Sequence, residues 1–480
     1  MKAFARTADS LARHPGKLEK IALLAEYFSS LDDADLLAAA RFFTGTPFAA
    51  RDQRTLSLGG RSIVAAAQRA WGFGGEDLSA GYREHGDLGA ALGPLVAPPA
   101  DLALFSETLR PASLLALFEQ IATVAGKSAG RKREALCERI LGACTEPLEA
   151  TYVVKILTGD LRVGLREGLV VEAIARAFGE TTDAVRRANM ASGDIGAVAV
   201  AARAGTLAHI RIAFGTPIGF MLASPIAYGS EYGELAGGRW VCEDKYDGIR
   251  AQLHKWGDRI ALFSRTLNDV THSYPEILQA ALAIQGDVML DGEIIARRDG
   301  RVLPFRYLQA RLQRKNVDPA LLTEVPVVFV AFDMLARGDD FLIDESLLAR
   351  RALLADISVP GRRLEISSFA HVESAMAAGA IEQQFDDARA RGHEGIVLKR
   401  ADAPYYPGRR GKWWLKLKKE LSTLDVVVVA VQWGHGKRAK VLSDYTFAVR
   451  GRNGELLTIG KAYSGLTDRE IAELTPWFLA

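Results

Sequence analysis

The 480 residues predict a multidomain protein that combines an all-α domain, an α+β domain and part of a β-barrel. Three observations predict this fold class. Apolar residues recur at helical spacing over residues 1–210, short β-branched runs alternate with helical segments over 211–421, and strand patterns fill 422–480. A chain of this length is expected to form two to four domains, which agrees with this division.

Residues 1–210 are predicted to be helical, because Leu18, Ile21, Leu24 and Phe28 have the spacing of one helix face. Residues 155–168 differ from the rest of this region, since they place three glycines and three cations between helices. Glycine lets backbone N–H groups approach a phosphate closely, and cations neutralise its charge. The segment therefore indicates either a phosphate contact or a plain helix–loop–helix connection.

Residues 211–237 are rich in glycine and proline, which is typical of a linker. Beyond it, β-branched runs at 325–330 and 395–398 alternate with helical segments such as 346–355. This alternation is typical of an α+β domain.

The last region, 422–480, is predicted to be all-β. Its strands are expected at 424–430, 445–450 and 455–459, with Asn453-Gly454 as the hairpin turn between the last two. Three or four strands are too few to close a barrel, so the barrel is expected to be partial.

Composition excludes several classes of protein. The net charge of +2 gives no global attraction to nucleic acid. Cys137, Cys144 and Cys242 are too few for a disulfide framework, and no Cys-x-x-Cys pair suggests structural zinc. No apolar run approaches a membrane span, and the N-terminus lacks a signal-peptide core. We therefore expect a cytoplasmic protein that acts away from membranes.

Five short motifs follow one another after residue 240, and they carry the chemistry. They are Glu-Asp-Lys-Tyr-Asp-Gly-Ile-Arg at 243–250, Phe-Ser-Arg at 263–265, Leu-Asp-Gly-Glu at 290–293, His-Glu-Gly-Ile-Val-Leu-Lys at 393–399 and Trp-Trp-Leu-Lys-Leu-Lys at 413–418. The first places a lysine amine beside carboxylates after a predicted strand, and such an amine can form a covalent bond once it is neutral. We interpret the third as an acidic turn between apolar runs.

The fifth motif is informative through strand geometry. Lys416 and Lys418 are two residues apart, so both point to one face of a strand while Leu415 and Leu417 point to the other. Two lysines on one face repel each other unless an anion lies between them. The pattern indicates a polyphosphate site or, equally, an exposed edge strand protected by lysines.

Together the five motifs resemble those of the nucleotidyltransferases that form a lysine–nucleotide adduct, and most closely those of the ATP-dependent DNA ligases. The resemblance extends over nearly the whole chain. Residues 1–210 resemble the DNA-binding domain, 211–421 the adenylation (nucleotidyltransferase) domain with an ATP-grasp-like fold, and 422–480 an OB domain that is cut short.

The resemblance implies a role for each motif residue. Lys245 would be the nucleophile that becomes AMP-lysine, and Glu243 would lie at the adenine edge. Arg250 and Glu293 would hold the ribose, and Phe332 would stack on the adenine ring.

A second set of residues would handle phosphate and metal. Arg265 would contact phosphate at the nick, and Lys416 and Lys418 the α-phosphate. A divalent cation, Mg²⁺ or another such as Mn²⁺, is expected because magnesium needs only one or two carboxylates beside its waters. The candidate carboxylates are Asp247, Glu293 and Glu394.

A free lysine is protonated at neutral pH, so the nucleophile must lose a proton before it attacks. Neighbouring cations and partial burial favour the neutral amine, and the same cations stabilise charge on the phosphoryl oxygens. The implied reaction has three steps: Lys245 takes AMP from ATP, AMP passes to the 5′-phosphate at a nick, and the 3′-hydroxyl expels it. The expected partner is nicked double-stranded DNA, held by a monomer through backbone contacts, with the protein associated with the bacterial nucleoid.

One departure from the family stands out. Its members carry a further basic motif of Arg-x-Asp-Lys type late in the OB domain, and this chain ends before that motif. We therefore expect slower adenylation than in an extended form. The alternatives are a catalytically weak protein that binds nicks or DNA ends, and an RNA ligase, although an RNA ligase would lack the long helical region.

Overall fold

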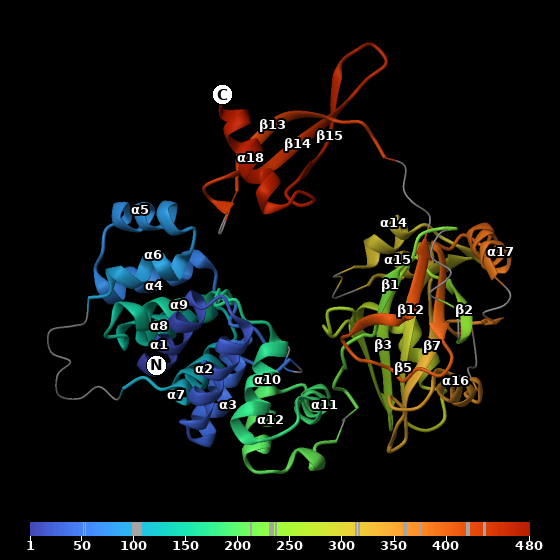
Figure 1. Ribbon diagram of the computed structural model, residues 1–480, viewed down its shortest axis with the longest axis horizontal. Helices are drawn as coiled ribbons and strands as arrows, with labels where there is room; N and C mark the ends of the chain where they lie inside the picture. Colours follow the sequence, from blue (N-terminus) through green and yellow to red (C-terminus); the bar gives the residue numbers. More distant parts are fainter. Residues whose placement is uncertain are drawn as a thin grey trace. The chain divides into compact units, whose positions relative to one another are not determined.

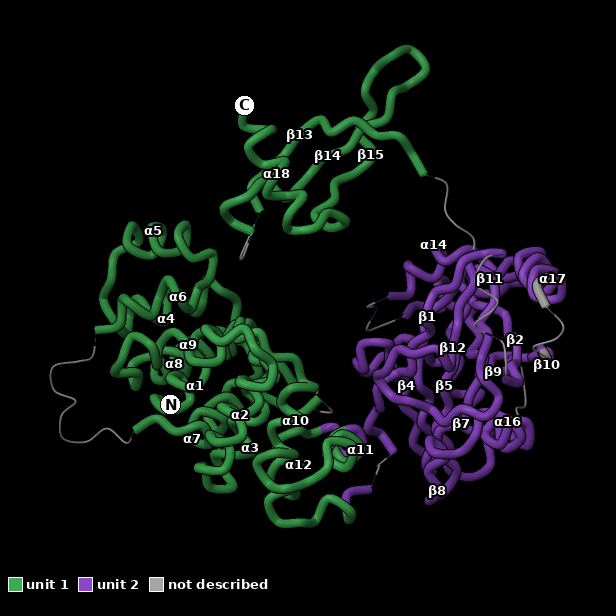
Figure 2. The backbone as a smooth tube through the Cα atoms, viewed as in Figure 1, with its two compact units in different colours: residues 1–189, 194–209, 422–480 green, residues 190–193, 210–421 purple. Residues whose placement is uncertain are grey.

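The computed structural model describes residues 1–50, 52, 54–97, 108–211, 214–229, 235, 238–312, 314, 317–358, 362–373, 377–418, 423–434 and 438–480. It divides into two compact units (Figure 2). Unit 1 comprises residues 1–189, 194–209 and 422–480, and unit 2 comprises 190–193 and 210–421. The boundary predicted between residues 421 and 422 lies outside the described residues.

The N-terminal part of unit 1 is built from helices (Figure 1), which confirms the all-α prediction. Ile21, Leu24 and Phe28 are buried on one face of α2, whereas Leu18, in its first turn, is 78% exposed. The helices are α1 Lys2–Arg13, α2 Lys17–Ser29, α3 Asp33–Phe43, α4 Gly60–Trp71, α5 Gly75–His85, α6 Leu88–Leu92, α7 Pro111–Thr123, α8 Ala129–Gly142, α9 Pro147–Thr158, α10 Glu167–Phe178, α11 Thr182–Ser192 and α12 Ile195–Arg203.

The segment 155–168 joins α9 to α10. Gly159 ends α9 in the left-handed conformation, with φ of 69°, and Arg162 also has positive φ, 52°. The Arg162 guanidinium is held by Asp160, with an Nε–Oδ2 distance of 2.7 Å. Lys155 lies 3.4 Å from the carboxylate of Asp87. Both cations thus have carboxylate partners within the domain.

Unit 2 contains two sheets. Among the described residues their strand orders are β1-β12-β11-β2-β10 and β4-β3-β5-β7-β8, with β6 beside β5 and β9 beside β7. The strands are β1 Leu222–Pro225, β2 Arg239–Lys245, β3 Ile249–Trp256, β4 Arg259–Ser264, β5 Val288–Arg298, β6 Arg301–Val302, β7 Val327–Arg337, β8 Asp340–Phe341, β9 Leu364–Ile366, β10 Ala370–Glu373, β11 Gly395–Arg400 and β12 Arg410–Lys418. The helices are α13 Pro275–Ala281, α14 Phe305–Leu308, α15 Pro319–Glu324, α16 Leu347–Ala355 and α17 Ala377–Ala390.

An apolar cluster joins the two sheets of unit 2. It contains Met289 of β5, Phe332 and Leu335 of β7, and Trp414 of β12. A second cluster packs α17 against the other face of the β1-β12-β11-β2-β10 sheet through Phe385. This arrangement of strands and helices confirms the α+β prediction.

Two predictions for unit 2 are wrong. The segment 211–237 contains β1, which pairs in parallel with β12, so its described part is not only a linker; residues 212–213, 230–234 and 236–237 lie outside the described residues. The acidic motif at 290–293 is not a turn, because β5 runs through it without a break. Gly292 serves packing there: a Cβ on it would lie 2.4 Å from the Phe329 ring.

The C-terminal part of unit 1 holds a sheet of order β13-β14-β15, formed by β13 Val427–Trp433, β14 Leu442–Arg450 and β15 Leu456–Ala462. Gly454, with φ of 85°, lies in the turn between the last two strands, as the sequence predicts. The all-β prediction for this region is wrong at its end, where α18 Asp468–Leu479 forms. Thr467 caps this helix in a capping box with Glu470, a signal that the sequence carries.

None of the helices formed by the described residues has the length and apolarity needed to cross a membrane.

Candidate active site

A cavity of about 550 Å³ in unit 2 is lined by residues of both its sheets. It brings together all the predicted site residues except Lys418, which is exposed at the end of β12. The predicted residues that line it are Glu243, Lys245, Asp247, Arg250, Arg265, Glu293, Phe332, Glu394 and Lys416.

Strand alternation explains how one sheet supplies many of these side chains. Glu243 and Lys245 are two residues apart on β2, and Val397 of β11 lies opposite Glu243 and beside Lys416 of β12. Directly opposed residues share a face, so these side chains all point to the cavity. The alternate residues, such as Leu415 and Leu417, are buried in the cluster under α17. The predicted division of the lysines and leucines of β12 between two faces is therefore confirmed.

Lys245 is the last residue of β2, and its ammonium group donates a hydrogen bond to Glu394 Oε2. The two residues are also joined by their backbones, since the N–H of Glu394 donates to the carbonyl oxygen of Lys245 at 2.9 Å. Gly395 follows with φ of 154°, and a Cβ there would lie 2.2 Å from the carbonyl oxygen of Leu417. Glycine at this position allows β11 to lie between β2 and β12 and brings the carboxylate to the lysine.

Two carboxylates share the space beside this lysine. Burial, together with the charge and hydrogen bond of Glu394, raises the pKa of Asp247 above its ordinary value. Burial also favours a raised pKa at Glu394, but the hydrogen bond and charge of Lys245 hold it below its ordinary value. Among the described residues no group of three or more His, Cys, Asp or Glu side chains is arranged to hold a metal. The pair nevertheless carries the oxygen ligands and the mutual repulsion that suit a divalent cation.

Gly248 brings the turn between β2 and β3 close to β5. A Cβ on Gly248 would lie 2.3 Å from the carbonyl oxygen of Ile294 and 2.9 Å from Cγ of Glu293. This close approach places Glu293 at the end of the cavity that holds Lys245 and Glu394. Burial raises the pKa of Glu293 to about 8, against the opposing charges of Arg250 and Lys245.

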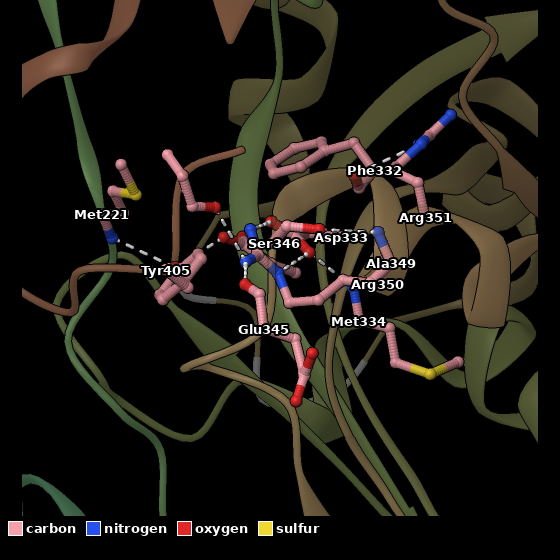
Figure 3. A network of polar contacts seen from close by, with 12 residues as sticks. Met221, Phe332, Asp333, Met334, Glu345, Ser346, Ala349, Arg350, Arg351 and Tyr405 are labelled. Carbon is pink, nitrogen blue, oxygen red and sulfur yellow. Dashed lines mark hydrogen bonds and ion pairs between the residues drawn. The ribbon is translucent and has the colours of Figure 1, made fainter. Parts of the chain in front are cut away.

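Arg250 is held by protein groups. Its guanidinium makes two hydrogen bonds to Asp291, at 3.1 and 2.7 Å, and a third to the carbonyl oxygen of Met221 at 2.6 Å. The hydroxyl of Tyr405 donates to the same carboxylate at 2.7 Å. It also accepts from the N–H of Met221 at 3.0 Å (Figure 3). Asp291 is fully buried, so this network fixes the guanidinium at the cavity wall.

The opposite end of the cavity holds a buried carboxylate. Glu243 Oε2 accepts from Lys399 Nζ at 2.9 Å and from the Ser367 hydroxyl at 3.4 Å, whereas Glu243 Oε1 is buried without a hydrogen-bond partner. The Lys399 ammonium lies 4.1 Å from the ring centre of Phe332 and 4.4 Å from that of Trp414. Lys399 was not among the predicted site residues. The sequence feature that could have identified it is a lysine placed directly after the apolar run Ile-Val-Leu at 396–398.

Two arginines of α16 bind β7 at Phe332 and at the next residue, Asp333 (Figure 3). Arg351 donates to the carbonyl oxygen of Phe332 at 3.1 Å. Arg350 makes two hydrogen bonds to Asp333, at 2.8 and 2.9 Å, and both side chains are fully buried. These arginines were also missed, because spacing alone does not distinguish a buried arginine from one on a solvated helix face.

The cavity wall also carries a group of cations: Lys416, Arg410 and Arg265. Burial, followed by the charges of Arg410, Lys245, Lys418 and Arg265, lowers the pKa of Lys416. Arg410 lines the cavity and was not predicted, although it stands next to Arg409 at the start of β12. Such a group of cations attracts a polyphosphate and favours neutral amines nearby.

Two family models match the chain: "ATP dependent DNA ligase domain" over residues 220–418 and "DNA ligase N terminus" over residues 1–175. The chain is 43% identical over 504 residues to a "Probable DNA ligase" of Koribacter versatilis (strain Ellin345), with 100% of this chain and 85% of that protein covered. It is 34% identical over 484 residues to a "DNA ligase" of Methanoculleus marisnigri (strain ATCC 35101 / DSM 1498 / JR1), with 99% and 85% covered. The solved structure Pmar-Lig_PreS3 is similar in fold, with a TM-score of 0.60 at 16% identity over 99% of this chain and 91% of that chain.

Proposed function

We infer the roles of individual residues from one premise: the chain belongs to the ATP-dependent DNA ligases and seals nicks in DNA. Lys245 is the nucleophile in this proposal. The observation that carries it is the position of its amine, which lies in the cavity, hydrogen-bonded to Glu394 and near Lys416.

We assign the end of the cavity at Glu243 to adenine. An ionised carboxylate only accepts hydrogen bonds, and adenine offers a donor in its exocyclic amine. Glu243 Oε1 is a buried acceptor without a partner, which suits that amine. Phe332 and Trp414 supply aromatic surface beside it, on which a purine can stack.

The ribose then lies between adenine and the reactive lysine, near Arg250 and Glu293. At neutral pH the raised pKa of Glu293, about 8, favours a protonated carboxyl, which can donate a hydrogen bond to a ribose hydroxyl. Arg250 meets the sugar with an orientation already set by Asp291.

In the first step, Lys245 Nζ attacks the α-phosphorus of ATP, the bond to the bridging oxygen breaks and pyrophosphate leaves. The ammonium proton must depart first, and Glu394 is the acceptor to which it already donates. Lys416, Arg410 and Arg265 stabilise the charge on the phosphoryl oxygens. Lys418, at the exposed end of β12, adds a further positive charge when it contacts a phosphate. AMP then passes to the 5′-phosphate, and attack by the 3′-hydroxyl expels it.

We propose Asp247 and Glu394 as the carboxylates that hold a divalent cation, with Glu293 as a third candidate. Magnesium keeps several waters and bridges to substrate phosphates, so two protein carboxylates are sufficient. A cation held there would supply positive charge to the phosphates and would relieve the repulsion between the two carboxylates.

The DNA substrate is proposed to be a nicked duplex bound by a monomer. The second and third steps need both ends of the nick in register, which favours contacts to the sugar–phosphate backbone over contacts to bases. A reducing compartment such as the cytoplasm suits the three cysteines, which are all free and buried.

The test uses labelled ATP, GTP and NAD in separate incubations, followed by a chase with nicked duplex DNA. We expect a covalent label from ATP alone, its discharge by nicked DNA, and no label on Lys245→Ala. Label retained by Lys245→Ala would overturn the assignment of the nucleophile. If intact duplex discharged the label from ATP as well as nicked duplex does, the assignment of the nick as the substrate would be overturned.

A further inference from the structure

Lys399 lies at the base-binding end of the cavity, where the reaction itself assigns it no role. It belongs to β11, and its neighbour on β2 is Val241, so its side chain reaches diagonally to Glu243 on the same face. The Lys399 and Glu243 side chains are 3% and 2% exposed. A charged pair this deeply buried is costly to form, which calls for an explanation beyond stability.

The contacts of the pair are asymmetric. Lys399 holds Oε2 of Glu243, the Ser367 hydroxyl donates to the same oxygen, and Oε1 is left without a hydrogen-bond partner while the residue lines the cavity. The lysine is itself held in place by the rings of Phe332 and Trp414, which lie beneath its ammonium group. One carboxylate oxygen is thus anchored and the other is offered to a ligand.

A second cation competes for the offered oxygen. Arg351 Nη1 lies 4.0 Å from Glu243 Oε1, slightly beyond hydrogen-bonding distance. If Oε2 were released, the carboxylate could turn toward Arg351 and Oε1 would be taken by it. The contact with Lys399 opposes this rotation.

We propose that Lys399 is a positioning residue for base selection, which orients Glu243 so that Oε1 accepts a hydrogen bond from the 6-amino group of adenine. This inference rests on the proposed role of Glu243 at the adenine edge. It adds that selectivity for a 6-aminopurine depends on a lysine that makes no contact with the amine. Guanine, which carries an acceptor at this edge, is repelled by the same oxygen.

The experiment compares ATP with purine riboside 5′-triphosphate, which lacks only the 6-amino group, in covalent labelling of the full chain. Because this hydrogen bond has a charged acceptor, the wild type is expected to have a KM for ATP that is roughly 10- to 100-fold lower than its KM for the analogue. In Lys399→Met the preference falls to about threefold or less, because the KM for ATP rises while the KM for the analogue and kcat change little. If Lys399 had a purely structural role, the substitution would weaken the binding of ATP and of the analogue equally.

Two further variants keep the test decisive. Lys255→Met removes another buried lysine of unit 2, which donates to the carbonyl oxygen of Gly286 at 2.9 Å, and it is expected to keep the wild-type preference. Glu243→Met/Lys399→Met replaces both charged side chains with apolar ones of similar length, so it is expected to fold. Methionine at 243 offers no oxygen to the 6-amino group, so the double variant and Glu243→Met alone are expected to show the same loss of preference for ATP.

Three results would overturn the inference: no preference for ATP in the wild type, a wild-type preference retained by folded Lys399→Met, or a clear difference in preference between the double variant and Glu243→Met. The first of them would also remove the assignment of Glu243 to the adenine amine. All three leave the ligase reaction and its nucleophile intact, since Lys245 still becomes labelled. Absence of any label from ATP would instead refute the proposed function.

Discussion

The cavity contains two lysine–glutamate pairs that are alike in composition and opposite in environment. Lys245 and Glu394 are 23% and 36% exposed, whereas Lys399 and Glu243 are 3% and 2% exposed. The first pair lies at strand ends beside Asp247, and the second lies within β2 and β11 above two aromatic rings. A partly exposed pair separates at little cost, while a buried pair does not.

This difference suits two different tasks. A nucleophile must release its counter-ion, lose a proton and move toward phosphorus, so an exchangeable partner is an advantage. A base-binding group must keep one orientation, so a partner that cannot leave is an advantage. The depth of burial, rather than the chemistry of the pair, separates the two roles.

The sharpest test of the comparison makes one substitution in both pairs. We expect Lys399→Met to lower the free energy of unfolding by about 3 kcal/mol, because it leaves a buried carboxylate without its main partner. We expect Lys245→Met to change it by less than about 1 kcal/mol while abolishing covalent labelling. Urea unfolding and labelling with ATP measure both effects. Equal losses of stability would show that burial does not distinguish the pairs.

A smaller effect is expected from the partner of the nucleophile. Glu394→Ala should slow single-turnover adenylation by roughly 100-fold, since it removes the nearest proton acceptor and a proposed metal ligand. Stability should stay within about 1 kcal/mol of the wild type, because the pair is partly exposed. Asp402→Ala is the matched control: it breaks an exposed pair with Arg400 in the same unit and should leave the rate unchanged. An unaffected rate in Glu394→Ala would remove the carboxylate from the mechanism.

The last prediction concerns the dependence of stability on pH. Burial raises the pKa of Glu293 from 4.5 to about 8, so the folded protein binds a proton that the unfolded chain releases between these values. The contribution of Glu293 is therefore most favourable below pH 4.5 and is lost as pH rises to about 8. Without ATP, Glu293→Gln should gain stability relative to the wild type as pH rises through this window. Parallel unfolding profiles for the two proteins would contradict the raised pKa.

The sequence predictions were accurate where structure depends on residues close together in the chain, and wrong where it depends on contacts between distant residues. Periodicity identified the N-terminal helices and the two faces of β12, because both depend on neighbours along the chain. It failed at the motif 290–293, where aspartate and glycine indicated a turn. There Arg250 neutralises the buried Asp291, and Tyr405 donates a hydrogen bond to it. The Phe329 ring occupies the space over Gly292, so the strand continues.

The C-terminal region shows the reverse case, in which a local signal was present and overlooked. Thr467 and Glu470 form the capping box of α18, yet the strand pattern before them dominated the prediction. The segment 211–237 failed for a different reason: glycines and prolines outweighed the short strand β1, whose pairing with β12 is remote in sequence.

The sequence by itself determined the class of protein and the order of its motifs, because the covalent chemistry needs particular side chains at short spacings around Lys245. Only the tertiary structure decided which of them meet, which are buried and which oxygen of Glu243 is left open. The role of Lys399 depends on two strands and two aromatic rings that come together in space. Burial and orientation arise from contacts between distant segments, and no spacing along the chain encodes them.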